Sequence, residues 1–255
     1  IIFICSPANT HYKYIKMFSA NKRYIFCEKP SVTTNYAIKK LQSYKRNNIY
    51  FNFNYVKSRA FDFIKKEMKD KKNGELIHIN ISATHGLFFK KNYKNNWRSN
   101  SLNIFDKITG NLGIHYINFA LNLIGKIKKF QKSESKFSKR GVDTSLINLE
   151  FDKGQTVTIF LSYASVMTQD IKIFFTNSIF EINNKRVYKF HPRDYFNKKG
   201  LFTKPQGKLI SKNMDLSVQS LENSIKYFMS VIQSKNSLDK KLYLNSLMSS
   251  KVLLK

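Results

Sequence analysis

The first 55 residues alternate short apolar runs with stretches of helical spacing, and this alternation restricts the fold more than any other feature. Apolar runs at 1–5, 24–27 and 50–55 predict three strands. Helical patterns at 10–20 and 33–46 lie between them. Strands joined by crossover helices run parallel. We therefore predict half of a doubly wound parallel α/β sheet at the start of the chain.

The chain changes character after residue 58. Strand patterns recur with turn signals between them, whereas helical spacing is confined to a few segments, so we predict an α+β region with mainly antiparallel strands. The strands are expected at 75–84, 146–151, 156–162, 171–176 and 178–182. The helices are expected at 59–73, 114–124, 216–232 and 238–254, and residues 191–212 are expected to form a long loop.

The positive charge is large, with 45 Lys and Arg against 16 Asp and Glu, a net charge of +29. The lysines are scattered, and no zinc-finger spacing or RNA-recognition strand accompanies them. Because 42% of the residues are apolar, the chain can bury a core and is not a charge-driven disordered protein. The charge is interpreted as a solvated basic surface, while binding of a polyanion and steering of an anionic substrate also stay open.

The cysteines and histidines indicate neither a disulfide framework nor a metal site. Cys5 and Cys27 are expected to pack at the ends of two neighbouring strands, which suits a reducing compartment. No apolar stretch reaches the ~20 residues that span a bilayer. We therefore expect a cytoplasmic protein without a membrane partner. No metal site is expected, because the histidines are dispersed without ligand spacing: His11, His78, His85, His115 and His191.

Polar residues and prolines follow the first two predicted strands. Ser6-Pro7 and His11 come after the first strand, and Glu28-Lys29-Pro30 comes after the second. Parallel α/β sheets bind ligands at the carboxyl ends of their strands, so both segments are candidate binding residues.

In order and spacing these motifs resemble the glucose-fructose oxidoreductase, inositol dehydrogenase and rhizopine-catabolism family (Gfo/Idh/MocA). Further segments in matching places are Trp97-Arg98 and Gly110-Asn111-Leu112-Gly113-Ile114-His115. The resemblance implies a truncated Rossmann-like parallel sheet, followed by an α+β domain with a large, mainly antiparallel open sheet. Residues 1–56 would be the C-terminal half of the dinucleotide-binding domain, and 57–255 the substrate-binding and oligomerisation domain.

The resemblance also implies a function, a hydride transfer between NAD or NADP and a hydroxyl or keto carbon of a sugar, sugar derivative or nucleotide-sugar. Lys29 and His115 would form the catalytic pair. Trp97, Arg98 and Asn111 would contact substrate, and Asn111 stands where the family commonly has Asp. The cofactor would contact Ser6, Pro7, His11, Glu28, Lys29 and Pro30.

More than one function is compatible with the sequence. The chain opens on Ile1 without the family's G-x-G-x-x-G loop, which is expected upstream, so the chain can be an incomplete enzyme or a noncatalytic remnant. A basic nucleic-acid-binding protein and an NAD-dependent glycosidase or lyase are also compatible with it, although no specific nucleic acid is expected. The resemblance implies a homo-oligomer formed through the sheet of the second domain.

Overall fold

The computed structural model describes residues 1–19, 23–44, 48–91, 103–138, 141–214, 216–217 and 219–254. They form two compact units, neither of which is one continuous stretch of chain. The first unit consists of Ile1–Ser58, Ser101–Leu123 and Leu216–Lys255, and the second of Arg59–Asn100 and Ile124–Asp215. Packing therefore joins three later helices to the first 58 residues, and a division of function near residue 56 stays a prediction.

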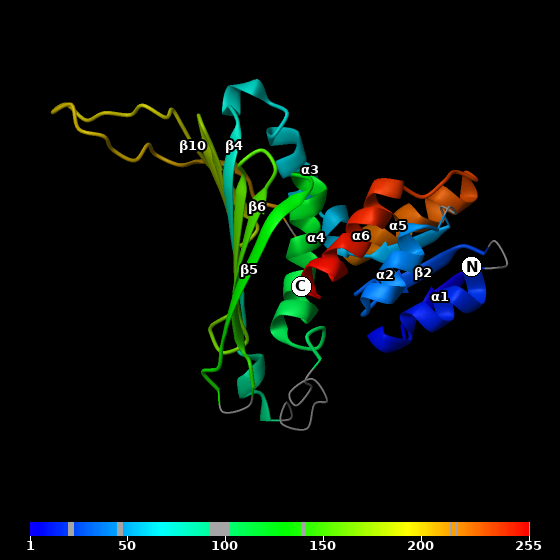
Figure 1. Cartoon of the computed structure of the whole chain (residues 1–255). Helices are drawn as coiled ribbons and strands as arrows, with labels where there is room; N and C mark the ends of the chain where they lie inside the picture. Colours follow the sequence, from blue (N-terminus) through cyan, green and yellow to red (C-terminus); the bar gives the residue numbers. More distant parts are fainter. Residues whose placement is uncertain are drawn as a thin grey trace. The chain divides into compact units, whose positions relative to one another are not determined.

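The first unit contains a three-stranded parallel sheet in the order β1-β2-β3. Its strands are β1 (Ile2–Ile4), β2 (Ile25–Glu28) and β3 (Ile49–Asn52). Its helices are α1 (His11–Ser19), α2 (Asn35–Gln42), α4 (Ile114–Leu123), α5 (Ser220–Gln233) and α6 (Lys240–Leu253). Figure 1 shows α1, α2, α5 and α6 around the strands. The prediction of a parallel Rossmann-like sheet is confirmed.

Local chemistry explains where these elements begin and how they hold together. The hydroxyl of Thr34 accepts a hydrogen bond from the amide of Ala37 and caps α2, a contact worth about 1 kcal/mol. Asp239 caps α6 in the same way. Helix α5 packs on the sheet through an aromatic cluster that buries Phe26, Tyr50 and Phe228.

The second unit is built on an eight-stranded sheet in the order β11-β10-β9-β8-β4-β7-β6-β5. All neighbouring pairs are antiparallel except β4 and β7. The strands are β4 (Leu76–Thr84), β5 (Ile127–Ser135), β6 (Thr144–Phe151), β7 (Thr156–Ser162), β8 (Thr168–Phe175), β9 (Ile179–Asn183), β10 (Arg186–Phe190) and β11 (Lys208–Ser211). The mainly antiparallel open sheet predicted from the sequence is confirmed.

Alternating burial gives this sheet one apolar face, because successive side chains of a strand point to opposite sides. Ile79 and Ile81 of β4, with Ile147 of β6, are fully buried. Helix α3 (Arg59–Glu67) covers part of the sheet, and Phe63 meets Phe180 of β9 edge to face. In Figure 1 the segment that follows β10 extends beyond the sheet.

Several boundaries differ from the sequence prediction. β5, β10 and β11 were not predicted as strands, and β11 lies within the expected loop 191–212. The third strand ends at Asn52, because Asn54–Lys57 form a 3-10 turn. Within the described residues, no helix combines the length and the apolar character needed to cross a bilayer.

Candidate active site

The ends of β1 and β2 are held together by one buried histidine. The ring of His11 lies at the start of α1, with Nδ1 at 2.8 Å from the carbonyl oxygen of Pro30 and Nε2 at 2.9 Å from that of Ser6. Ser6 in turn shares a 2.6 Å hydrogen bond with Thr10, and Thr10 donates to the carbonyl of the exposed Pro7. The structure therefore brings the predicted residues Ser6, Pro7, His11 and Pro30 into one cluster.

Hydrogen bonds fix both the backbone next to Lys29 and the ammonium group of Lys29 itself. On one side, Ser31 is fully buried and donates to the carbonyl of Ser246 on α6, at 3.0 Å. On the other, the ammonium of Lys29 donates to the backbone carbonyl and the side-chain oxygen of Asn111, at 2.6 and 2.8 Å. The peptide bond between Lys29 and Pro30 is cis.

Asn111 lies in a wide helical turn, Thr109–Gly113, that leads into α4. This turn needs glycine at position 110, since a Cβ there would collide with the backbone of Ile104 and Phe105. The backbone amide of Asn111 donates to the carbonyl of Lys107. Asn111 therefore presents both of its oxygens from a fixed segment.

His115 lies four residues after Asn111, one turn further along the same helix. Its ring is stacked on Tyr55 at 4.7 Å between centroids and meets Phe53 edge to face. Its Nδ1 atom is buried and has no hydrogen-bond partner among the described residues. Burial, with the positive charge of Lys29, holds the pKa of His115 well below its usual value, so the ring is neutral at neutral pH.

Glu28, which precedes Lys29, is the partly buried end of a chain of hydrogen bonds that continues into the core. Asn52 donates to its carboxylate at 2.7 Å, Ser224 donates to Asn52 at 2.7 Å, and the hydroxyl of Tyr50 lies 2.7 Å from Ser224. Burial raises the pKa of Tyr50, so its phenol keeps the proton that it donates. Sequence reasoning missed these partners, because Ser224 is 172 positions from Asn52.

The remaining candidates from the sequence are placed as follows. Trp97 and Arg98 lie outside the described residues. Cys5 and Cys27 are free thiols; Cys27 is buried, whereas Cys5 is exposed, so the packing expected from the sequence is wrong for Cys5. Burial raises the pKa of Cys27. Tyr55 is a neighbour of His115 that the sequence did not single out, although it closes the apolar run of the third predicted strand.

Two protein-family models match the chain. A Gfo/Idh/MocA C-terminal domain matches residues 61–181, and an oxidoreductase family with an NAD-binding Rossmann fold matches residues 1–50. The chain belongs to the Gfo/Idh/MocA family of oxidoreductases. A search of curated proteins found no match to this Gfo/Idh/MocA chain.

Solved structures share the Gfo/Idh/MocA fold at low identity. An oxidoreductase from Agrobacterium radiobacter, solved with NAD+, L-tartaric acid and magnesium, is 15% identical at a TM-score of 0.78, covering 99% of this chain and 75% of that one. A levoglucosan dehydrogenase in complex with NADH and levoglucosan is 14% identical at a TM-score of 0.78, and the match covers 99% of this chain and 76% of that one. A myo-inositol dehydrogenase from Corynebacterium glutamicum is 16% identical at a TM-score of 0.72, and the match covers 99% of this chain and 75% of that one. These likenesses concern the fold.

The family is an NAD-binding one, and the described residues fit the nicotinamide end of such a cofactor. The cluster lies at the carboxyl ends of parallel strands, where α/β sheets bind ligands. The buried, unpartnered Nδ1 of His115 is a polar atom that a bound ligand can satisfy. The sequence holds no G-x-G-x-x-G motif, so no residue is assigned to the cofactor phosphates.

Proposed function

We propose that the chain acts as an NAD(P)-dependent dehydrogenase on a sugar, sugar derivative or nucleotide-sugar. The observation that carries the proposal is the bond from the Lys29 ammonium to Asn111, one helical turn before His115. A cation and a neutral imidazole thereby belong to one small cluster at the strand ends. The sugar-like substrate class is supported by the family and by the levoglucosan and inositol dehydrogenases of the same fold.

Oxidation of an alcohol requires removal of a hydride from carbon and of a proton from oxygen. NAD(P), when bound at this site, would supply the acceptor for the hydride. His115 is neutral at neutral pH because of its lowered pKa, and it accepts the hydroxyl proton as the O–H electrons form the carbonyl. Lys29 stabilises the negative charge that develops on the oxygen. In the reverse direction His115 returns the proton.

The other predicted residues take supporting roles in this proposal. Asn111 holds the Lys29 ammonium and orients a substrate hydroxyl. Ser6, Pro7, His11, Glu28, Lys29 and Pro30 are proposed to contact the cofactor. Trp97 and Arg98 are proposed substrate contacts from the sequence alone.

An assay of cofactor reduction with a panel of polyols, sugars and nucleotide-sugars tests the proposal. We expect NAD+ or NADP+ to be reduced with at least one substrate, and Lys29→Ala to lower kcat by about 10²–10³-fold. Ser230→Ala changes an exposed position on α5 and serves as the control. Lack of cofactor binding and turnover would support a noncatalytic remnant, and sugar release without net reduction a glycosidase or lyase.

We also propose that a second copy of the chain covers the open face of the large sheet. Leu146 and Phe160 lie directly opposite each other on β6 and β7, and both are exposed. Adjacent exposed apolar side chains favour a contact surface. Sedimentation velocity tests this: a dimer or larger assembly is expected, and Phe160→Lys should dissociate it, whereas a wild-type monomer would rule it out.

A further inference from the structure

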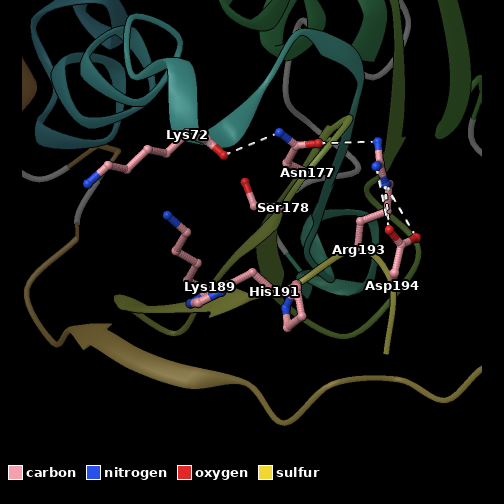
Figure 2. A pocket seen from close by; sticks show the side chains of 8 residues that line it. Lys72, Asn177, Ser178, Lys189, His191, Arg193 and Asp194 are labelled. Atoms are coloured by element: carbon pink, nitrogen blue, oxygen red, sulfur yellow. Dashed lines mark hydrogen bonds and ion pairs between the residues drawn. The ribbon is translucent and has the colours of Figure 1, made fainter. Parts of the chain in front are cut away.

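The second unit holds a cavity of about 430 Å³ that lies outside the proposed active site. It is lined by residues from three segments: the turn before β4, the turn between β8 and β9, and the end of β10 with the residues after it. Its size falls in the range of about 300–1,000 Å³ that is common for small-molecule sites. Figure 2 shows Lys72 and Lys189 on one side of the cavity and Arg193 with Asp194 on the other.

The wall of this cavity is fixed by a buried asparagine. Asn73 accepts a hydrogen bond from Ser178 at 3.0 Å and donates to the carboxylate of Glu67 at 2.9 Å. The backbone carbonyl of Asn73 also accepts a hydrogen bond from the backbone amide of Asn177. Gly74 adopts a φ of 78°, and a Cβ there would collide with the side chain of Thr176. The two turns are therefore in close contact, which sets the position of Lys72 relative to the β8–β9 turn.

The charges on the lining are unbalanced. The only carboxylate among the lining residues, Asp194, pairs with Arg193 at 3.4 Å. Neither Lys72 nor Lys189 forms an ion pair with any residue that the structure describes. The ammonium of Lys189 lies 5.1 Å from the centre of the Phe180 ring, a cation–π contact that leaves its charge unneutralised. Two positive charges on one concave surface favour a ligand with two negative charges.

We propose that this cavity binds a phosphate group, with Lys72 and Lys189 as its principal cationic contacts. A phosphate carries about two negative charges near neutral pH, and both Lys and Arg bind it. Asn177 accepts a hydrogen bond from Arg193 at 3.4 Å, which keeps the guanidinium at the rim of the same cavity. The phosphate is either free or carried by a small organic molecule, for which the volume leaves room.

The high net charge of the chain makes a matched control necessary, because a basic surface attracts anions without a built site. Lys128 and Lys153 are exposed lysines of the same unit that lie outside the cavity. The double variants Lys72→Ala/Lys189→Ala and Lys128→Ala/Lys153→Ala change the net charge equally. They differ only in whether the cavity loses its two lysines.

Calorimetric titration of the full chain with inorganic phosphate, glucose 6-phosphate and glucose, at fixed ionic strength, tests the proposal. We expect saturable binding of a phosphate-containing probe, none of glucose, and at least tenfold weaker binding to Lys72→Ala/Lys189→Ala. The control variant should bind within twofold of wild type. Equal affinity for both probes indicates free phosphate, and tighter binding of glucose 6-phosphate a phosphorylated molecule.

Two results would overturn the proposal: no saturable binding of either phosphate probe, or equal losses in the cavity and control variants, which would indicate attraction to the surface as a whole. Thermal unfolding without ligand checks that both variants fold. Lys29→Ala should bind the probes as wild type does, so the outcome is independent of the proposed dehydrogenase activity.

Discussion

The ammonium of Lys29 is bonded to both oxygens of Asn111, at 2.6 Å to the backbone carbonyl and 2.8 Å to the side chain, across 82 positions of sequence. A backbone carbonyl and a side-chain amide oxygen thus hold the ammonium of Lys29 together. The positive charge of Lys29 contributes to the lowered pKa of His115.

Replacing Asn111 separates these two contacts. Asn111→Ala removes the side-chain oxygen but leaves the backbone carbonyl, so the free energy of unfolding should fall by only about 1 kcal/mol. Loss of orientation of Lys29 should lower kcat/KM by about tenfold, equivalent to about 1.4 kcal/mol. Asn111→Asp keeps an acceptor oxygen and is the matched variant. Urea denaturation and steady-state kinetics measure both effects, and wild-type kinetics in Asn111→Ala would contradict the role of its side chain.

The lowered pKa of His115 makes stability depend on pH. In the unfolded chain a histidine has a pKa of about 6.5, so below this pH the unfolded state binds more protons. The contribution of His115 is fully present above pH 6.5 and declines as the pH falls toward the lower pKa of the folded state. His115→Asn should therefore show a shallower loss of stability between about pH 6.5 and 5.

Urea denaturation across that pH range provides the measurement. His78 and His85 also have pKa values lowered by burial, and both remain in the variant. The difference between the wild-type and His115→Asn curves isolates the one ring. If the free energy of unfolding of the two proteins changed in parallel with pH, the result would contradict a lowered pKa for His115.

The hydrogen bonds that Ser224 forms with Asn52 and Tyr50 predict that removing its hydroxyl lowers the free energy of unfolding. Ser224→Ala leaves the oxygen of Asn52 and the hydroxyl of Tyr50 without their shared partner, at a cost of about 1–3 kcal/mol. Ser230→Ala on the same helix removes an exposed hydroxyl and should cost under about 0.5 kcal/mol. Chemical denaturation compares the two variants, and equal stabilities would show that the network contributes nothing.

The turn that carries Asn111 should not tolerate a side chain at position 110. Gly110→Ala places a methyl group against the backbone of Ile104 and Phe105, and we expect the free energy of unfolding to fall by about 3 kcal/mol. Gly86→Ala meets its nearest atom at 3.7 Å and should be close to neutral. Thermal unfolding compares the two, and a stable Gly110→Ala protein would mean that the turn can widen.

The sequence predicted those elements whose own residues carry the signal. The parallel strands β1 and β2 correspond to short apolar runs, and α2 lies within the helical pattern predicted at 33–46. β5 was missed because it lies at the sheet edge and is mostly exposed, with lysines and polar residues in place of an alternating pattern. β11 was missed for a similar reason, since three of its four residues are exposed.

The residues of the candidate site also fall into those that a sequence motif marks and those that only the folded structure brings together. Motifs in the sequence mark Lys29 and His115 as candidates, and in the structure the charge of Lys29 contributes to the lowered pKa of His115. Tyr55, Asn52 and Ser224 carry no motif, and their contacts depend on segments that are distant in the sequence. Hydrogen-bond partners separated by 172 residues follow from tertiary packing, which local patterns do not encode.

The contact between Asn52 and Ser224 has a consequence for biosynthesis. During translation β3 is synthesised long before α5. Asn52 therefore cannot form its hydrogen bond with Ser224 until most of the polypeptide has been synthesised. A nascent chain arrested before residue 220 lacks Ser224, the serine that donates a hydrogen bond to Asn52. This hydrogen-bonded chain is therefore completed late, once α5 has left the exit tunnel and docked.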